Sequence, residues 1–379
     1  MTTKKALVLS GGGGRGAYHV GVIEALVERG WMQDGHGPDI IAGTSIGAIN
    51  AAALASGLTI ANLKERWLDM HTEDVHRLSG DLPAISRPVM RFLMHSVLTS
   101  DTHGGVASPL PPDERSMSAE GLLERLGKVF RSRPFRSLLD TTPWRHTLSR
   151  WMDFERINSP VAPALLLTAT DLQSGDLRVF CNRPLREHPA DVIAIEHLMA
   201  SSSIPTIYPW TEIGGHKYWD GAVLANTPLG PVIDLAAGDD VEIVVVMMTP
   251  WEADPDAMRE QLQQMPEDLV QALSLTLDWA LLASYRAALK MLRAYNRLAE
   301  AALKLERAAR QTGDSSLTLG GGIPRIIAEP LVIAPQQLMP LEWIVDYEEH
   351  NHLALFEMGR KDALRALDNR LLNSLLDGA

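Results

Sequence analysis

A serine flanked by two glycines is the first pattern in the sequence that could carry chemistry. Gly43-Thr44-Ser45-Ile46-Gly47 fits G-x-S-x-G, in which a serine hydroxyl stands on a sharp turn from a strand into a helix and the glycines leave space for that turn. The amino end of the helix would favour negative charge that develops beside the hydroxyl. The pattern therefore predicts a nucleophilic serine, although an ordinary glycine-rich turn between a strand and a helix explains the same residues.

A second glycine-rich turn lies at residues 11–16, with the sequence Gly-Gly-Gly-Gly-Arg-Gly. The amide groups of such a turn can converge on an anion. Because Gly11, Gly13 and Gly16 match G-x-G-x-x-G, a dinucleotide phosphate loop is one interpretation. That loop needs an acidic residue about twenty positions further on, at the end of the second strand, but here the second strand runs directly into the serine turn. We therefore favour an oxyanion hole, which two glycine turns at the ends of adjacent strands suit better.

A third candidate is Asp220, which Gly221 and Ala222 follow. An aspartate beside a glycine is common in turns, so this pair means little alone. The three patterns together, in this order, resemble the patatin-like phospholipases, including bacterial patatin-like acyl hydrolases. Residues 11–16 match that family's G-G-G-x-R/K-G, residues 43–47 its G-x-S-x-G and residues 220–222 its D-G-A/G; residues 169–176 and 200–205 are also similar.

The resemblance implies a patatin-like three-layer α/β fold with a mostly parallel central sheet, in a single domain over residues 1–379. It implies a catalytic dyad of Ser45 and Asp220, with an oxyanion hole formed by the amides of Gly12, Gly13 and Gly14. The supporting motif residues are Gly11, Arg15, Gly16, Gly43, Gly47 and Gly221. The implied activity is hydrolysis of acyl esters in phospholipids or related lipids, without a metal or a cofactor.

The chemistry of such a dyad is that of a serine esterase. Asp220 would take the Ser45 proton as the serine attacks the ester carbonyl, the glycine amides would bind the oxyanion, and water would cleave the acyl-enzyme. Aspartate is a poor base for an alcohol in water, so the site must be dry. Acyl transfer to another acceptor and a non-catalytic lipid-binding role remain alternatives. A Ser-His-Asp triad would need a histidine, for which His19 and His216 are the first candidates.

The elements that must position these residues alternate between strands and helices. Short apolar runs predict strands, and apolar residues at helical spacing predict helices. The predicted strands are residues 7–9, 38–42, 164–170, 177–180 and 241–247, with an edge strand at 326–333 that Pro330 interrupts. The predicted helices are one that ends at Gly30, one at 46–56 and one from Leu353 onward.

Two regions look inserted into a catalytic core of residues 5–250. Residues 71–158 are rich in proline, arginine and histidine and contain no convincing strand, which indicates a helical and loop-rich cap. Residues 266–311 predict a long helical extension, which a C-terminal strand and helix at 323–379 follow.

Basic residues raise two further questions. Arg15 could orient the glycine loop, bind a phosphate head group or lie on the surface. A basic stripe on the helical extension lies beside an apolar stripe, and it could face solvent, form a dimer contact or rest on anionic lipid. The basic stripe is Arg286, Lys290, Arg293 and Arg297, and the apolar stripe is Leu281, Tyr285, Ala288, Leu292 and Tyr295.

The composition is that of a globular protein, with 379 residues of which 46% are hydrophobic and 22% charged. A formal net charge of -12 argues against nucleic acid as the main partner. Cys181 is the only cysteine, so no internal disulfide can form. The apolar run at 6–9 is too short for a signal peptide, and polar residues and glycines interrupt the uncharged stretch 40–63, which excludes a membrane span. We expect a cytoplasmic protein with an acyl-lipid substrate; peripheral membrane contact and a homo-oligomer stay open.

Overall fold

The computed structural model describes residues 3–80, 136–185, 188–236, 239–251, 269–312 and 325–377. An eight-stranded sheet has the order β10-β9-β1-β2-β5-β8-β7, with β6 paired to β5 beside that path. Five neighbouring strands are parallel: β10 (Leu331–Ile333), β9 (Val241–Val246), β1 (Lys4–Leu9), β2 (Ile40–Thr44) and β5 (Ala164–Asp171). The antiparallel pairings involve β6 (Leu177–Cys181), β7 (Thr211–Ile213) and β8 (His216–Asp220). The sheet is mostly parallel, as predicted.

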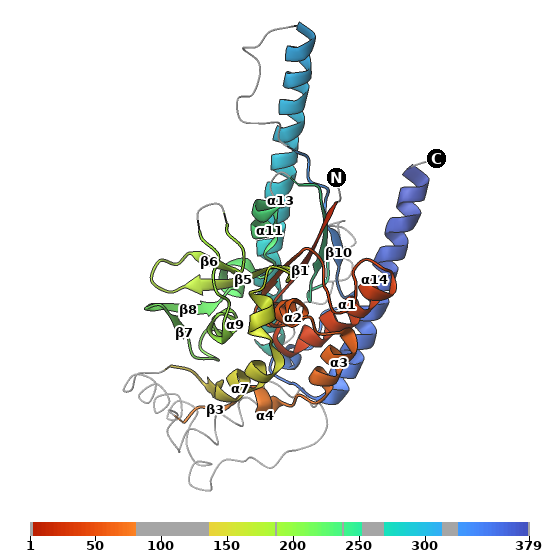
Figure 1. Cartoon of the computed structure of the whole chain (residues 1–379). Coiled ribbons are helices and arrows are strands. Elements are labelled where there is room, and N and C mark those ends of the chain that lie inside the picture. Colours follow the sequence, from red (N-terminus) through yellow and green to blue (C-terminus); the bar gives the residue numbers. More distant parts are fainter. Residues whose placement is uncertain are drawn as a thin grey trace.

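The side chains of β1 divide between two hydrophobic cores. Leu7 and Leu9 pack with α1 (Ala17–Glu28), α2 (Ile46–Ala55) and α14 (Glu349–Asp377). Ala6 and Val8 pack with α11 (Leu229–Leu235) and α13 (Leu269–Thr312). Because successive strand residues point to opposite faces, helices cover both faces of the sheet. The result is the three-layer α/β fold that the sequence predicts (Figure 1).

The strands predicted from apolar runs are all present, with ends that differ by a few residues. β10 begins directly after Pro330 and lies at the edge of the sheet, where a missing amide donor is tolerated. Strands β7 and β8 are not among the strands predicted from the sequence. Their short, mixed runs include the exposed residues His216 and Lys217, so they lack the continuous apolar character by which the other strands are recognised.

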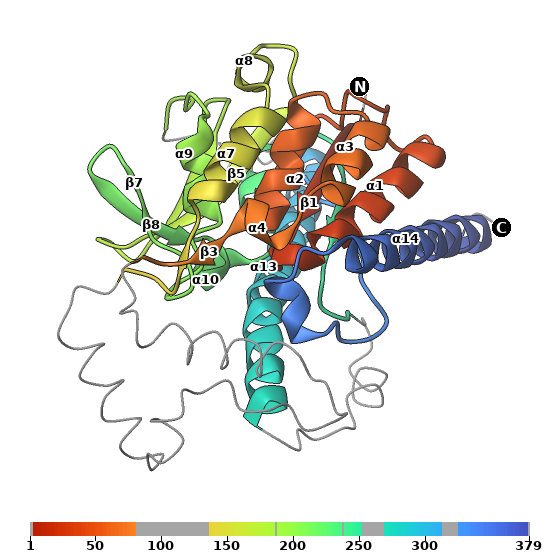
Figure 2. The same ribbon diagram turned by 90° about the horizontal axis from the view of Figure 1, so that it is seen from below.

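The C-terminal helix α14 lies along α1, as Figure 2 shows. The two helices approach closely because each presents a glycine to the other. A Cβ at Gly21 would lie 1.9 Å from the Phe356 carbonyl oxygen, and a Cβ at Gly359 would lie 2.1 Å from the Tyr18 carbonyl oxygen. Any larger side chain at either position would separate the helices.

The predicted cap falls largely outside the described residues, since 81–135 are not among them. Its described parts contain α4 (Thr72–Val75), α7 (Thr142–Trp151) and α8 (Phe154–Ile157). They also contain β3 (Arg77–Leu78), which pairs antiparallel with β4 (Leu139–Asp140). The expectation that this region has no strand is therefore wrong. These strands are two residues long, which is too short for a periodic pattern to appear in the sequence.

The predicted helical extension is α13, and its C-terminal part projects beyond the sheet (Figure 1). Asn296 exchanges hydrogen bonds with the backbone of Ile327, just before β10, at 2.7 and 3.0 Å. The residues of α13 after Asn296 therefore lie past the amino end of that strand. Within the described parts of the chain, no helix combines the length and apolar character that a membrane crossing requires.

Candidate active site

Ser45 occupies the turn between β2 and α2, with a φ of 56° and a ψ of -127°. Such backbone strain in a residue with a side chain is typical of a nucleophile elbow. A Cβ at Gly43 would lie 2.3 Å from the Gly47 carbonyl oxygen, and a Cβ at Gly47 would lie 2.3 Å from the Leu9 carbonyl oxygen. The Ser45 amide donates to Ser201 Oγ over 3.0 Å. The local structure is thus the strand-turn-helix that G-x-S-x-G predicts.

Asp220 is the last residue of β8, one strand away from β2 because β5 lies between them. Its amide donates to the Ser203 carbonyl over 2.9 Å, and its Oδ1 accepts the Ala222 amide over 2.8 Å. The Ser45 side chain lies close enough to this carboxyl to lower its pKa. Ser45 is 4% exposed and Asp220 is 2% exposed. The fold therefore brings together, out of water, two side chains that are far apart in the sequence.

Burial raises the pKa of the Asp220 carboxyl from 3.8 to about 7, while hydrogen bonds from Ser45 and Ala222 oppose that rise. Desolvation disfavours the charged form of a carboxylic acid. A carboxylate with a pKa near neutrality is a much stronger base than an aspartate in water, and it is still partly ionised at pH 7. The burial that the sequence analysis requires for an aspartate base is present.

The glycine loop, residues 11–16, follows β1 and leads through a short helix, η1 (Gly13–Gly16), into α1. Gly11 lies against the serine, since a Cβ at this position would be 3.0 Å from Ser45 Cβ. Its amide donates to the Asn226 backbone oxygen over 3.2 Å and to Asn226 Oδ1 over 3.0 Å. In the described part of the chain no acceptor is found for the amides of Gly12, Gly13 and Gly14, and the first amides of a helix have no partner within it.

The remaining supporting glycines make close contacts of their own. A Cβ at Gly16 would lie 2.4 Å from Ile46 Cγ1, so α1 begins close against the helix that follows Ser45. A Cβ at Gly221 would lie 2.4 Å from Thr168 Oγ1 on β5. These glycines allow the two turns and β5 to meet with little space between them.

Arg15 is buried, with 1% of its surface exposed. Its Nη1 lies 3.0 Å from Asp278 Oδ1 on α13. Its Nη2 donates to the Met339 carbonyl over 2.8 Å, and Nε and Nη2 donate to the Pro340 carbonyl over 3.2 and 3.1 Å. The interpretation of Arg15 as a surface residue is therefore wrong. Its donors bind other parts of the chain, which supports a role in holding the glycine loop rather than in binding a head group.

Residues 338–347, here called the C-terminal strap, cover one side of the glycine loop. The strap contains a short helix, η3 (Leu341–Ile344). A Cβ at Gly13 would lie 1.9 Å from the Ile344 carbonyl oxygen, and a Cβ at Gly14 would lie 2.3 Å from the Asp346 carbonyl oxygen. No sequence motif predicts a role for the strap, for Ser201 or for Asn226. Of these residues, only Ser201 could have been identified from the sequence, because it lies in the stretch 200–205, which resembles the family.

The three histidines nearest to the motifs have other partners. Asn50 Nδ2 lies 3.3 Å from His19 Nδ1, and burial lowers the pKa of His19 to about 3. The Ala194 amide donates to His197 Nδ1 over 2.9 Å. His216 Nδ1 lies 2.8 Å from Asp171 Oδ2 at an exposed position. Among the described residues, no hydrogen bond joins these histidines to the proposed dyad.

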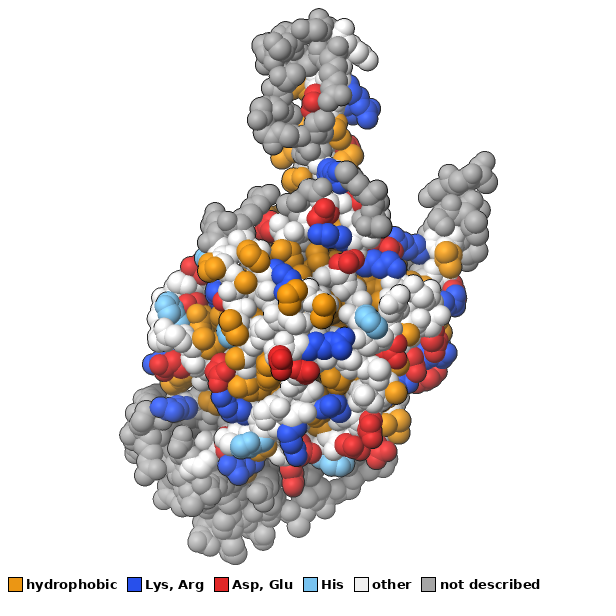
Figure 3. Space-filling view, viewed as in Figure 1, with side chains coloured by type: hydrophobic (Ala, Val, Ile, Leu, Met, Phe, Trp, Pro, Cys, Tyr) orange, Lys and Arg blue, Asp and Glu red, His pale blue; other side chains and the backbone are white. Residues whose placement is uncertain are grey.

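The basic stripe on α13 faces outward, while most of the apolar stripe beside it is covered. Tyr285 and Leu292 are buried in the core, whereas Tyr295 is 42% exposed. Arg293 forms a two-pronged ion pair with Glu329, at 2.6 and 2.8 Å. The stripe therefore borders a packed helix face. Figure 3 shows hydrophobic and basic side chains together on the projecting part of α13.

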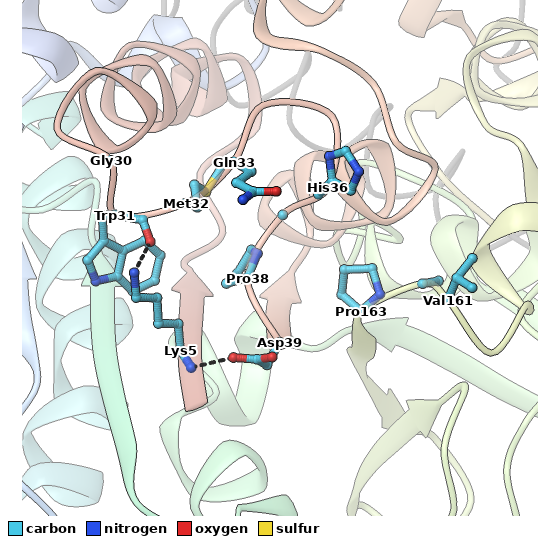
Figure 4. A pocket seen from close by; sticks show the side chains of 12 residues that line it. Lys5, Gly30, Trp31, Met32, Gln33, His36, Pro38, Asp39, Val161 and Pro163 are labelled. Atoms are coloured by element: carbon cyan, nitrogen blue, oxygen red, sulfur yellow. Dashed lines mark hydrogen bonds between the residues drawn. The ribbon is translucent and has the colours of Figure 1, made fainter. Parts of the chain in front are cut away.

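A pocket of about 410 Å³ lies at the amino ends of β1 and β2, whereas Ser45 follows the carboxyl end of β2. Figure 4 shows the residues that line this pocket. Its walls include the amino end of β1 and the turn that leads into β2. Lys5 donates through its amide to Asp39 Oδ2 over 2.7 Å and through Nζ to the Trp31 carbonyl over 2.6 Å. The polar groups of this pocket are thus partly bound to one another, and none of the sequence-predicted site residues lies there.

The fold and site define an α/β protein with a serine at a strand-to-helix turn, a buried aspartate and a glycine loop beside them. A family model described as patatin-like phospholipase matches residues 7–233. This range is more than half of the chain, so the chain belongs to the patatin-like phospholipase family. The match ends before α13, the strap and α14. In the described residues, no group of three or more His, Cys, Asp or Glu side chains is arranged to hold a metal.

Comparisons with solved structures give weaker similarities. VipD from Legionella pneumophila is 17% identical with a TM-score of 0.42, and the match covers 97% of this chain and 67% of that one. ExoU from Pseudomonas aeruginosa, in its complex with SpcU, is 18% identical with a TM-score of 0.28, over 84% of this chain and 64% of that one. A search of curated proteins found no significant match.

Proposed function

We propose that this protein is a lipid acyl hydrolase of the phospholipase A type, in which Ser45 is the nucleophile and Asp220 the base. Membership of the patatin-like phospholipase family supports hydrolysis of lipid esters. The observation that carries the residue assignment is the position of Ser45, on its strained turn, beside the buried Asp220 carboxyl, whose pKa burial raises to about 7. Ester hydrolysis of this kind needs a nucleophile and a general base whose pKa lies near 7, and Ser45 and Asp220 meet these requirements.

In the first half of the reaction, Ser45 Oγ attacks the ester carbonyl carbon while its proton passes to Asp220. The carbonyl oxygen becomes an oxyanion, which the amides of Gly12, Gly13 and Gly14 bind. When the tetrahedral intermediate collapses, the bond to the lipid alcohol breaks and that alcohol takes the proton from Asp220. An acyl-Ser45 ester remains.

In the second half, a water molecule attacks the acyl carbonyl and gives its proton to Asp220. Collapse of the second intermediate releases the fatty acid and returns the proton to Ser45 Oγ. The same amides bind both oxyanions. Because these dipoles are fixed in a site that excludes water, they need no reorganisation during the reaction.

A peripheral membrane contact is proposed for the projecting part of α13. The residues of α13 after Asn296, 297–312, contain four Lys or Arg and two Glu, whereas the whole chain has a net charge of -12. Leu298 and Leu305 in this part are 72% and 44% exposed, Met291 just before it is 73% exposed, and each of the three follows a basic residue in the sequence. An apolar row beside a basic row suits an anionic lipid surface. Since this part of α13 lies past the amino end of β10, such contact would hold the protein at a membrane rather than place lipid at Ser45.

Covalent labelling tests the proposed nucleophile. A fluorophosphonate probe should modify Ser45, and Ser45→Ala should lose both labelling and hydrolysis of a soluble ester. Hydrolysis of a panel of phospholipids, with and without added lysolipid, would define the substrate and separate free fatty acid from a transferred acyl group. Labelling that persists in Ser45→Ala would exclude the assignment.

A further inference from the structure

The glycine loop is held by parts of the chain that lie beyond the family match. We propose that Arg15 is a positioning residue, which sets the place of the oxyanion amides by binding α13 and the C-terminal strap. The active site is then completed by residues after 233, outside the range that the family model covers. This inference rests on the proposed function, because it assumes that the loop amides bind an oxyanion.

The acceptors around Arg15 come from two separate segments. Asp278 belongs to α13, and Met339 and Pro340 belong to the strap. The guanidinium is rigid and planar with donors in several directions, so one buried side chain can bind both segments at once. A lysine keeps the charge but has neither the planar fork nor the fixed directions of its donors. Arg15 therefore fixes the strap and α13 relative to the loop in a way that charge alone cannot.

Contacts made by the loop backbone point to the same two segments. The strap carbonyls of Ile344 and Asp346 reach the places where Cβ atoms of Gly13 and Gly14 would stand. On the other side, the Gly11 amide binds Asn226, whose own amide donates to Ser284 Oγ on α13 over 3.2 Å. The loop is thus held between α13 and the strap, on either side of the amides of Gly12, Gly13 and Gly14, for which the described residues provide no acceptor.

The position of these amides must be set within narrow limits. Oxyanion donors act at 2.7–3.1 Å from the developing charge, and a displacement of about 1 Å can lower a rate by about 10²-fold. A buried ion pair is in general a weak source of stability compared with apolar side chains of similar volume. The ion pair between Arg15 and Asp278 is therefore better explained by its effect on the position of the loop amides than by its effect on stability.

The test compares Arg15→Lys with Arg360→Lys. Arg360 is the control, because it forms an exposed ion pair between the C-terminal part of the chain and α1, with Glu28 at 3.0 and 3.1 Å. It does not contact the glycine loop. For each full-length variant, kcat and KM for a soluble ester are measured per active site, titrated with the fluorophosphonate. The rate of phosphonylation of Ser45 and the melting temperature are measured in parallel.

We expect Arg15→Lys to lower kcat by about 10- to 100-fold, to leave KM within about 2-fold and to slow phosphonylation, while Arg360→Lys keeps the parent values. A purely structural role predicts a lower melting temperature with an unchanged kcat per titrated site, and that result would overturn the inference. If Arg15→Lys does not fold, Asp278→Asn provides the same comparison, because it keeps the side-chain size and removes the charge that orients Arg15.

The two possible failures are distinguishable. If the parent labels at Ser45 and hydrolyses esters while Arg15→Lys and Asp278→Asn keep its kcat, the positioning role is wrong and the proposed function stands. If the parent is neither labelled nor active, the proposed function fails and the inference fails with it.

Discussion

The amide of Ser45 donates a hydrogen bond to Ser201 Oγ, 3.0 Å away, although 156 positions separate the two residues. Ser201 is buried at the end of α9 (Ile195–Ser201). This hydroxyl satisfies a backbone donor at the strained turn, where an unpartnered buried amide would cost about 1–3 kcal/mol.

Ser201→Ala should therefore lower both the free energy of unfolding, by about 1–3 kcal/mol, and the rate of ester hydrolysis. Ser202→Ala is the control, since the Ser202 hydroxyl, at the C-terminal cap of α9, donates to the Leu198 carbonyl and, among the described residues, forms no hydrogen bond with Ser45. Denaturant unfolding and steady-state kinetics would check this. Equal kinetics in the two variants would show that the elbow holds its geometry without Ser201.

The raised pKa of Asp220 predicts opposite pH dependences for activity and stability. The base must be ionised, so kcat/KM should rise with pH through about 7. Because the folded-state pKa lies above the unfolded value of 3.8, the unfolded chain loses this proton first as pH rises. The contribution of Asp220 to stability should therefore be largest below about pH 4 and be lost between about 4 and 7.

Asp220→Asn separates these two effects. It should abolish hydrolysis, and above pH 7 it should be more stable than the parent, by up to roughly 4 kcal/mol, since about three pKa units at 1.36 kcal/mol each are involved. The free energy of unfolding, measured for parent and variant at pH 5 and pH 8, would show whether the variant is the more stable of the two. A variant that loses stability at pH 8 relative to the parent would contradict a desolvated carboxylate at this position.

Catalysis without histidine is expected, because the histidines near the motifs bind other partners. His19→Gln, His197→Gln and His216→Ala should each keep substantial turnover per titrated active site, while Asp220→Asn does not. Removal of the histidine from a triad costs several orders of magnitude. A folded histidine variant as inactive as Asp220→Asn would identify that histidine as the base.

The glycine loop should respond unequally to added methyl groups. Gly13 has a φ of +60°, which costs other residues about 1–2 kcal/mol, and a Cβ there would meet the Ile344 carbonyl. A Cβ at Gly12 would lie 2.5 Å from Met248 Sδ, which belongs to a flexible side chain that can shift. Gly13→Ala should therefore lower the melting temperature and kcat more than Gly12→Ala, through displacement of the strap. Equal effects would argue against close contact between strap and loop.

The membrane proposal for α13 predicts a charge-dependent interaction. Lys290, Arg297 and Lys304 are exposed, whereas Arg293 is paired with Glu329. Reversal of those three residues to glutamate should weaken sedimentation with anionic vesicles and leave hydrolysis of a soluble ester unchanged. Vesicles of zwitterionic lipid are the control. Unchanged sedimentation would exclude lipid contact. If replacing Met291 and Leu298 by serine changes the molecular mass of the protein in solution, this face of α13 is instead a contact between copies of the chain.

The sequence by itself determined the fold class and the identity of the motif residues. Central parallel strands are buried on both faces and read as apolar runs, so β1, β2, β5 and β9 were predictable. The turn around Ser45 was predictable too, because glycines at both ends of a strand-to-helix turn have a local steric cause. The antiparallel strand β8, which carries Asp220, has no such local pattern.

Only the tertiary structure decided what surrounds these residues. The raised pKa of Asp220 comes from burial, which depends on the whole chain rather than on its neighbours in sequence. Arg15 contacts Asp278, which is 263 residues away in the sequence, and Met339, which is 324 residues away. Nothing in the local sequence around Met339 indicates that its carbonyl accepts a hydrogen bond. A motif specifies backbone shape over a few residues, whereas the electrostatics and rigidity of a site come from segments that meet only when the chain folds.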